Sequence, residues 1–208
     1  MPPSGGRAGV RQHEDVADPI QLREWRRLDY HDPEPVLRKL REVELEVIDA
    51  DLAPKLRHLR TNKLKSLRES RAAALFTLGM AEVLGTKVLV APGEAADYDF
   101  VTAWGDGDTL QFCPVQLKEW VPEELNQEVA LQHLFAGIAR SYPTSSETVV
   151  AIHVNRVGVL DIPSLVLPEL PVAGLWLFGA VREDQSEWCI VGDLLGEPRQ
   201  YSFRYPRP

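Results

Sequence analysis

The sequence predicts an α/β protein built around one mixed β-sheet. Two helical patterns precede Gly85, and after that residue short apolar runs read as strands with one further helical pattern among them. Gly105-Asp106-Gly107-Asp108 lies between two of these runs and predicts a tight hairpin turn. Helices and strands in this order are typical of a sheet with helices packed on its faces.

Composition narrows the class of protein. The chain has 208 residues, of which 44% are hydrophobic and 26% charged, and these values exclude wholesale disorder and fibrous classes. No apolar run reaches about 18 residues, so we expect no membrane span. The first residues contain no apolar signal region and there are only two cysteines, so we expect a cytoplasmic protein.

The chain divides into four expected segments. Residues 1–19 are rich in Pro, Gly and charge and are expected to form a flexible tail. Residues 20–65 should form an N-terminal helical segment, and residues 66–155 an α/β core. The β-rich remainder, 156–208, should pack on that core as an extension.

Apolar spacing and breakers predict the first elements. Residues 33–60 have mostly helical spacing, with Pro33 and Pro35 near the start and Pro54 as the expected break. Residues 66–84 are rich in Ala and Leu and predict a second helix that ends at Gly85.

The remaining elements are predicted from their apolar runs. Strands are expected at 87–91, 98–104 and 109–120, where Pro114 implies a bulge or an edge position. A helix at 123–140 and a buried strand at 148–154 should follow, and then three more strands that begin near GLWLFGAVR, EWCIVGDLL and QYSFRY.

The hairpin brings polar side chains together. A turn centred between Asp106 and Gly107 sets Asp97 across from Gln116 and Asp99 across from Pro114, and a bulge would shift this register by one residue. Asp99 and Gln116 are then diagonal neighbours, with Lys118 on the same face as Gln116. The face is open to two interpretations: a chemical site, or the ordinary polar side of a half-exposed strand.

This residue set suits chemistry on phosphates. A carboxylate and an amide or backbone oxygen can hold a hard divalent cation such as Mg²⁺. The cation can activate a water molecule and neutralise phosphate charge, while a nearby lysine can orient that water.

Asp99 in ADYDFVTAW, followed by Gln116-Leu117-Lys118 in CPVQLKEW, resembles the PD-(D/E)XK nuclease superfamily, in particular restriction-endonuclease-like branches with Gln-x-Lys in the third motif. The expected αβββαβ order over residues 66–154 is similar to the core of that superfamily. Two positions depart from the pattern: Gln116 replaces the commoner carboxylate, and Tyr98 replaces Pro before Asp99.

The resemblance implies a Mg²⁺- or Mn²⁺-dependent endonuclease that hydrolyses phosphodiester bonds, with DNA expected before RNA. Asp99 and Gln116 would be the metal ligands, and Lys118 would position the attacking water. The alternative is a catalytically inactive protein of the same fold that binds its partners in a defence or repair complex. Whether Asp97 shares the role of Asp99, and whether the chain forms a homodimer or a larger complex, stays open.

The superfamily often adds an acid from the first core helix, and this chain has two candidates. From Glu69 to Leu84 a helix rises roughly 22 Å, which matches the length of the following strand and its exit. Glu69 should therefore lie level with the hairpin acids, whereas Glu82 should lie at the far end. A second interpretation of Glu69 is an acid favoured by the helix dipole near the N-terminus.

Charge is concentrated in one stretch. Residues 55–71 contain seven basic side chains and a single acid, although the whole chain has 23 Lys+Arg against 31 Asp+Glu, a net charge of −8. The stretch predicts a surface for a nucleic-acid backbone or, alternatively, a solvated helix face.

Overall fold

The computed structural model describes residues 19–49, 65–93, 98–123, 130–142 and 146–208. Its centre is a seven-stranded mixed sheet in which the strands follow one another in chain order. Neighbouring strands are antiparallel except for the two pairs that β4 makes, with β3 and with β5, which are parallel. The strands are β1 (Val88–Pro92), β2 (Phe100–Asp106), β3 (Thr109–Trp120), β4 (Val149–Val154), β5 (Gly174–Ala180), β6 (Glu187–Gly192) and β7 (Arg199–Arg204).

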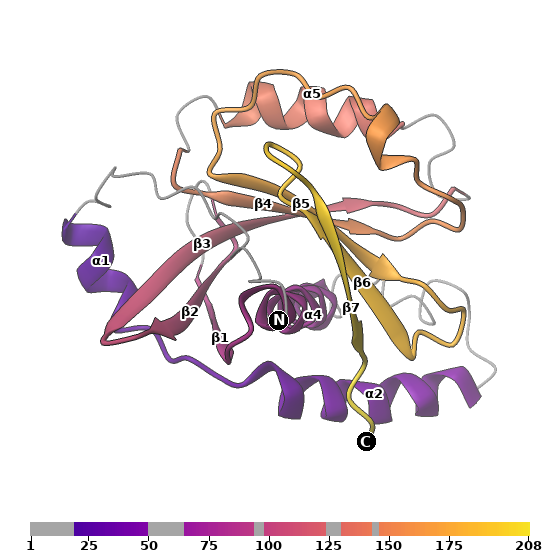
Figure 1. Ribbon diagram of the computed structural model, residues 1–208. Helices are drawn as coiled ribbons and strands as arrows, with labels where there is room; N and C mark the ends of the chain where they lie inside the picture. Colours follow the sequence, from indigo (N-terminus) through magenta and orange to yellow (C-terminus); the bar gives the residue numbers. More distant parts are fainter. Residues whose placement is uncertain (1–18, 50–64, 94–97, 124–129, 143–145) are drawn as a thin grey trace, which may run out of the picture.

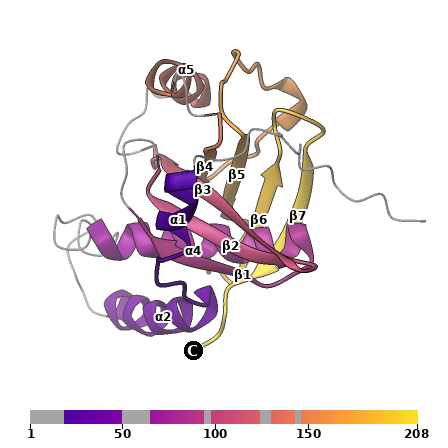
Figure 2. The same cartoon turned by 90° about the vertical axis from the view of Figure 1, so that its left-hand side faces the viewer.

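The sheet curves around one helix. Helix α4 (Lys65–Leu84) contacts β1, β3, β6 and β7, so strands from both edges of the sheet reach it. Helix α2 (Pro33–Asp49) packs against α4 on the side away from the sheet, and α5 (Leu131–Ser141) lies on the opposite face of the sheet (Figure 1). A short helix, α1 (Pro19–Trp25), lies beside the β2–β3 hairpin (Figure 2).

Strand alternation separates two apolar cores. Val115, Ala151 and Phe178 point towards α4 and join a core with Phe76 of that helix. Their sequence neighbours Val150, Ile152 and Leu177 point the other way and pack with Phe135 and Ile138 of α5. Because the side chains of one strand alternate between these cores, each position on β3 can be assigned to the α4 face or the α5 face of the sheet.

The predicted mixed α/β class and element order are confirmed. Over residues 65–154 the order is a helix, three strands, a helix and a strand. The last three strands continue the same sheet, so the expected β-rich extension is part of this one layer. Pro114 pairs regularly with Val101, and it lies just before β3 becomes paired with β4 at Val115. Before Val115 no described strand pairs with the second edge of β3, and an edge position of this kind tolerates a proline.

One predicted helix boundary is wrong. The second core helix begins at Leu131 rather than at 123, because Ala130 has an extended backbone (φ −68°, ψ 155°) that cannot continue a helix. Residues 124–129 lie outside the described part of the chain, as does the expected break at Pro54. The expected tail lies there too, apart from Pro19, which begins α1.

A cluster of charged groups ties α2, α4 and the C-terminus together. Glu44 of α2 forms ion pairs with Arg41, at 3.0 Å, and with Arg71 of α4, and the three side chains are only 11–16% exposed. The Arg71 guanidinium also donates to Gln185 Oε1 at 2.6 Å and lies over the Tyr205 ring. Burial in this cluster raises the pKa of the Tyr205 hydroxyl. We call these five residues the Arg71 cluster.

Candidate functional site

The candidate site lies where β2 begins beside β3. Phe100 faces Val115 and Asp106 faces Thr109, so the two-residue loop is Gly107-Asp108. Gly107 occupies the first loop position with φ +59°, a conformation that glycine adopts without strain. The predicted register is therefore wrong by two residues: Asp99 lies beside Gln116 rather than across from Pro114. Asp97 lies outside the described residues.

The Asp99 carboxylate holds the edge of β3. Its Oδ2 atom accepts hydrogen bonds from the Gln116 side-chain amide and from the backbone N–H of Leu117, the latter at 2.7 Å. The Asp99 N–H donates to the carbonyl oxygen of Val115 at 2.9 Å. Asp99 is itself exposed, so a solvent-accessible carboxylate is fixed in position beside a strand.

Gln116 and Lys118 follow on the α5 face of the sheet. Gln116 is 7% exposed, and its Nε2 atom donates to Asp99, which leaves the amide oxygen available as an acceptor. The Lys118 ammonium lies 5.0 Å from the centre of the Tyr142 ring, directly after α5. In the part of the chain that is described, no ion pair neutralises Lys118. We call Asp99, Gln116 and Lys118 the Asp99 cluster.

Glu69 lies on the other side of the sheet. It lines a hollow of about 160 Å³ together with Leu117, Lys118 and His153. Leu117 packs into the α4 core and His153 stacks on Phe178, so this hollow is on the α4 face. Glu69 does reach the level of Lys118 on β3, and Glu82 is not among the residues that line the hollow. Whether Glu69 is nearer than Glu82 to Asp99 stays a prediction.

Besides Arg68 of the basic stretch, the hollow contains two groups that the sequence alone did not indicate as site residues. Arg68, Glu119 and His153 line it, and Glu119 accepts a hydrogen bond from the Asn155 amide at 2.8 Å. Glu119 lies on the α4 face because it alternates with Lys118. The pairing of β3 with β4, which sets Glu119 beside His153, was the missing information, since these residues are far apart in the sequence.

The basic stretch 55–71 is described only from Lys65 onwards. Lys65 pairs with Glu69 at 3.4 Å, and Arg68 lines the hollow. Arg71 belongs to the Arg71 cluster, where its contacts with Glu44 and Gln185 hold it inside. Arg71 therefore fits neither interpretation of the stretch, the nucleic-acid surface or the solvated helix face, because it is buried and its charge is neutralised within the fold.

The described residues contain no group of three or more His, Cys, Asp or Glu side chains arranged to hold a metal ion. Nor does any described helix have the length and apolar character needed to cross a bilayer. Comparisons with protein-family models, curated proteins and solved structures found no match. The function of the chain is therefore inferred from the geometry of the site.

Proposed function

We propose that this protein is a metal-dependent nuclease that hydrolyses phosphodiester bonds in DNA, with the Asp99 cluster as its catalytic centre. The observation that carries the proposal is the fixed, exposed Asp99 carboxylate beside Gln116, with Lys118 one step further along the same strand face. The likeness of this residue pattern to PD-(D/E)XK nucleases supports the same conclusion.

The donor set fits a hard divalent cation such as Mg²⁺ or Mn²⁺. Both hydrogen bonds that described residues make to the Asp99 carboxylate fall on Oδ2, so Oδ1 can take a cation, and the Gln116 amide oxygen can add a neutral ligand. With a single certain anionic ligand, the protein should bind the ion weakly until a substrate phosphate adds its charge. When bound, the ion would polarise the phosphate and activate water.

The side chains of the chain itself have separate tasks in this proposal. Asp99 holds the cation and, through its bonds to Gln116 and Leu117, keeps the edge of β3 in place. Lys118 orients the attacking water or stabilises charge that develops on the phosphate, because its ammonium has no ion-pair partner in the described structure. Glu69 lines the hollow on the other face of the sheet, where it pairs with Lys65, so we give it no direct contact with the cation.

The test is cleavage of plasmid, single-stranded and branched DNA in the presence of Mg²⁺ or Mn²⁺. We expect metal-dependent cleavage by the natural protein and none by Asp99→Ala, since the cation loses its anionic ligand. Glu82→Ala is the matched control and should cleave normally. Unchanged cleavage by Asp99→Ala would contradict the mechanism.

A second candidate is a non-catalytic binding protein. It is favoured by the same bonds of Asp99, because a carboxylate that accepts from an amide and a backbone N–H also has a purely structural use. Absence of cleavage on every substrate and with both metals would select this candidate.

A further inference from the structure

Helix α1 and the turn that follows it carry three arginines that the catalytic proposal does not use. Arg23, Arg26 and Arg27 are all exposed, and none forms an ion pair with a described residue. The helical turn continues past the end of α1, because the Arg26 N–H donates to the carbonyl of Leu22 at 3.1 Å. Successive residues of a helix are about 100° apart, so the three arginines share one face.

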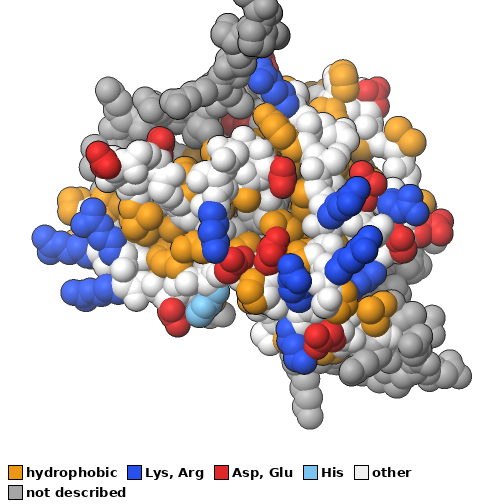
Figure 3. All heavy atoms as spheres, turned by 60° about the horizontal axis from the view of Figure 1, so that its bottom comes forward, with side chains coloured by type: hydrophobic (Ala, Val, Ile, Leu, Met, Phe, Trp, Pro, Cys, Tyr) orange, Lys and Arg blue, Asp and Glu red, His pale blue; other side chains and the backbone are white. Residues whose placement is uncertain are grey.

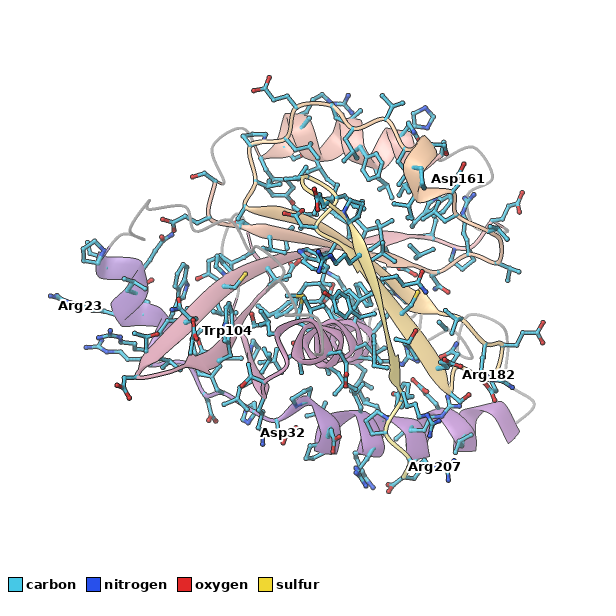
Figure 4. The ribbon with its side chains drawn as sticks, in the orientation of Figure 1. Arg23, Asp32, Trp104, Asp161, Arg182 and Arg207 are labelled. Atoms are coloured by element: carbon cyan, nitrogen blue, oxygen red, sulfur yellow. The ribbon has the colours of Figure 1, made fainter. Side chains whose placement is uncertain are left out.

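Trp25 fixes the direction of this arginine face. It is 2% exposed and points to the opposite side of the helical turn, into the protein. Its indole N–H donates to the Tyr98 hydroxyl at 3.2 Å, and the two rings meet edge to face. The arginines therefore point outward, as Figure 4 shows for Arg23. Figure 3 shows that basic side chains gather at the left-hand edge of the molecule, the side on which α1 lies in Figure 1.

The same contact places α1 beside the candidate site. Tyr98 immediately precedes Asp99, and the N–H of Gly93 donates to the Asp99 carbonyl at 3.3 Å. A side chain at Gly93 would meet both Tyr98 and Leu28, so the end of the α1 turn packs directly on the segment that carries Asp99. The arginine face lies about one helix diameter, roughly 10 Å, from that segment.

We propose that Arg23, Arg26 and Arg27 form a phosphate-binding surface for duplex DNA next to the Asp99 cluster. This inference rests on the proposed nuclease function and identifies the surface that holds the substrate. Arginine is suited to the role because its guanidinium pairs with phosphate oxygens in two-point contacts. Two acids, Glu24 and Asp29, lie in the same stretch of sequence as the three arginines, and the Asp29 carboxylate is 3.7 Å from the His31 ring. The stretch from Arg23 to Asp29 therefore has three positive side chains and two negative ones.

The placement predicts which step the arginines affect. They lie too far from Asp99 to touch the reacting phosphate, so they should bind the flanking backbone. Their loss should weaken DNA binding and raise KM while kcat stays unchanged. Binding to phosphates releases counterions, so each lost contact should also reduce the salt dependence of affinity, by about 0.9 in the slope of log K against log salt.

The experiment measures binding of a labelled 30-base-pair duplex of arbitrary sequence in EDTA, over a range of salt concentrations. The variant is R23Q/R26Q/R27Q. The control is R199Q/R204Q/R207Q, which removes the same charge from exposed arginines on and after β7, at the other edge of the sheet. We expect the first variant to lose affinity by about tenfold or more, with a lower salt slope, and the control to change by less than about twofold.

Equal effects of the two variants would show a response to total charge and would overturn the inference. Three other results would also overturn it. The α1 variant could bind the duplex as tightly as the natural protein does, or the natural protein could bind single strands alone or no DNA at all. A cleavage assay distinguishes failure of the arginine surface from failure of the nuclease proposal.

If the natural protein binds DNA through the three arginines but does not cleave it, the nuclease proposal fails and the arginine surface stands. If the α1 variant cleaves with unchanged KM, the surface fails and the nuclease stands.

Discussion

Two polar clusters lie on this fold, and they differ in how completely their charges are neutralised. In the Arg71 cluster, Glu44 pairs with two arginines, and Arg71 has further partners in Gln185 and two aromatic rings. In the Asp99 cluster, the carboxylate is exposed, and Lys118 lies over an aromatic ring without an ion-pair partner among the described residues. The charged groups of the Arg71 cluster neutralise one another, whereas the charged groups of the Asp99 cluster can still bind a ligand.

The difference indicates different uses of polar residues. Buried charges are tolerated when they are paired and hydrogen-bonded, and such a pair fixes the relative position of the elements that carry it. The Arg71 cluster joins α2, α4 and the C-terminal segment in this way. Asp99 joins only two neighbouring strands, and no ion pair among the described residues ties Lys118 to another element. We therefore assign the Asp99 cluster to the proposed function and the Arg71 cluster to stability.

The largest expected effect on stability is that of Glu44→Ala. This change leaves the half-buried Arg41 and the buried Arg71 without their carboxylate, and we expect a loss of about 3 kcal/mol in the free energy of unfolding. Urea denaturation measures it. Glu42→Ala is the control on the same helix: its pair with Lys39 is exposed, and the change should cost less than about 0.5 kcal/mol. Equal losses in the two variants would remove the distinction between the clusters.

Lys118→Ala tests the other side of the comparison. We expect turnover to fall by roughly 10²-fold, because the proposed function places the lysine in the transition state, while DNA affinity and the melting temperature stay close to those of the natural protein. Steady-state kinetics and thermal unfolding measure these quantities. Lys39→Ala is the control, since it removes an equal charge far from β3. A destabilised but fully active Lys118→Ala protein would make Lys118 structural.

Asp32 provides the smallest effect and a dependence on pH. Its carboxylate accepts from the Glu34 N–H at 3.0 Å at the start of α2 and pairs with Lys87 before β1 at 2.6 Å (Figure 4 labels Asp32). The hydrogen bond from Lys87 lowers the pKa of Asp32. Its contribution to stability is therefore complete above the unfolded-state pKa, near 3.9, and is lost as the pH falls through the lower folded-state value.

We expect Asp32→Ala to destabilise the protein by about 1 kcal/mol at pH 7, the usual value for a helix cap. The difference from the natural protein should shrink below pH 4. Denaturation at pH 7 and pH 3 measures it, with the highly exposed Asp29→Ala as control. A difference that persists at pH 3 would show that the charge of Asp32 is not involved.

The order of elements could be predicted because it depends on local patterns. The change of period at Gly85 and the run 109–120 mark elements whose apolar spacing is unambiguous, and β3 has the predicted bounds. The hairpin register could not be predicted from the turn residues alone. Gly105 and Gly107 both allow a turn. In the structure it is Gly107 that has a positive φ, so Asp106 and Thr109 are the pair that flanks the loop.

The candidate site was predictable only in part. Asp99, Gln116 and Lys118 lie near one another in the sequence of a single hairpin, so their proximity follows from strand alternation. Glu119 and His153 meet through the parallel pairing of β3 with β4, which local patterns do not determine. The inward position of Arg71 depends on Glu44 and Tyr205, which belong to distant parts of the chain, and a run of basic residues gives no sign of it.

The central claim is that the Asp99 cluster is catalytic, and the most direct measurement compares cleavage with stability in Asp99→Asn. Asparagine keeps a side-chain oxygen to accept from the Leu117 N–H but removes the negative charge that a cation needs. With plasmid DNA and Mg²⁺ or Mn²⁺, we predict cleavage reduced by more than about 10³-fold, a loss of roughly 4 kcal/mol of transition-state stabilisation, at a melting temperature close to that of the natural protein. Full cleavage by Asp99→Asn, or a loss of cleavage that only accompanies unfolding, would contradict the claim.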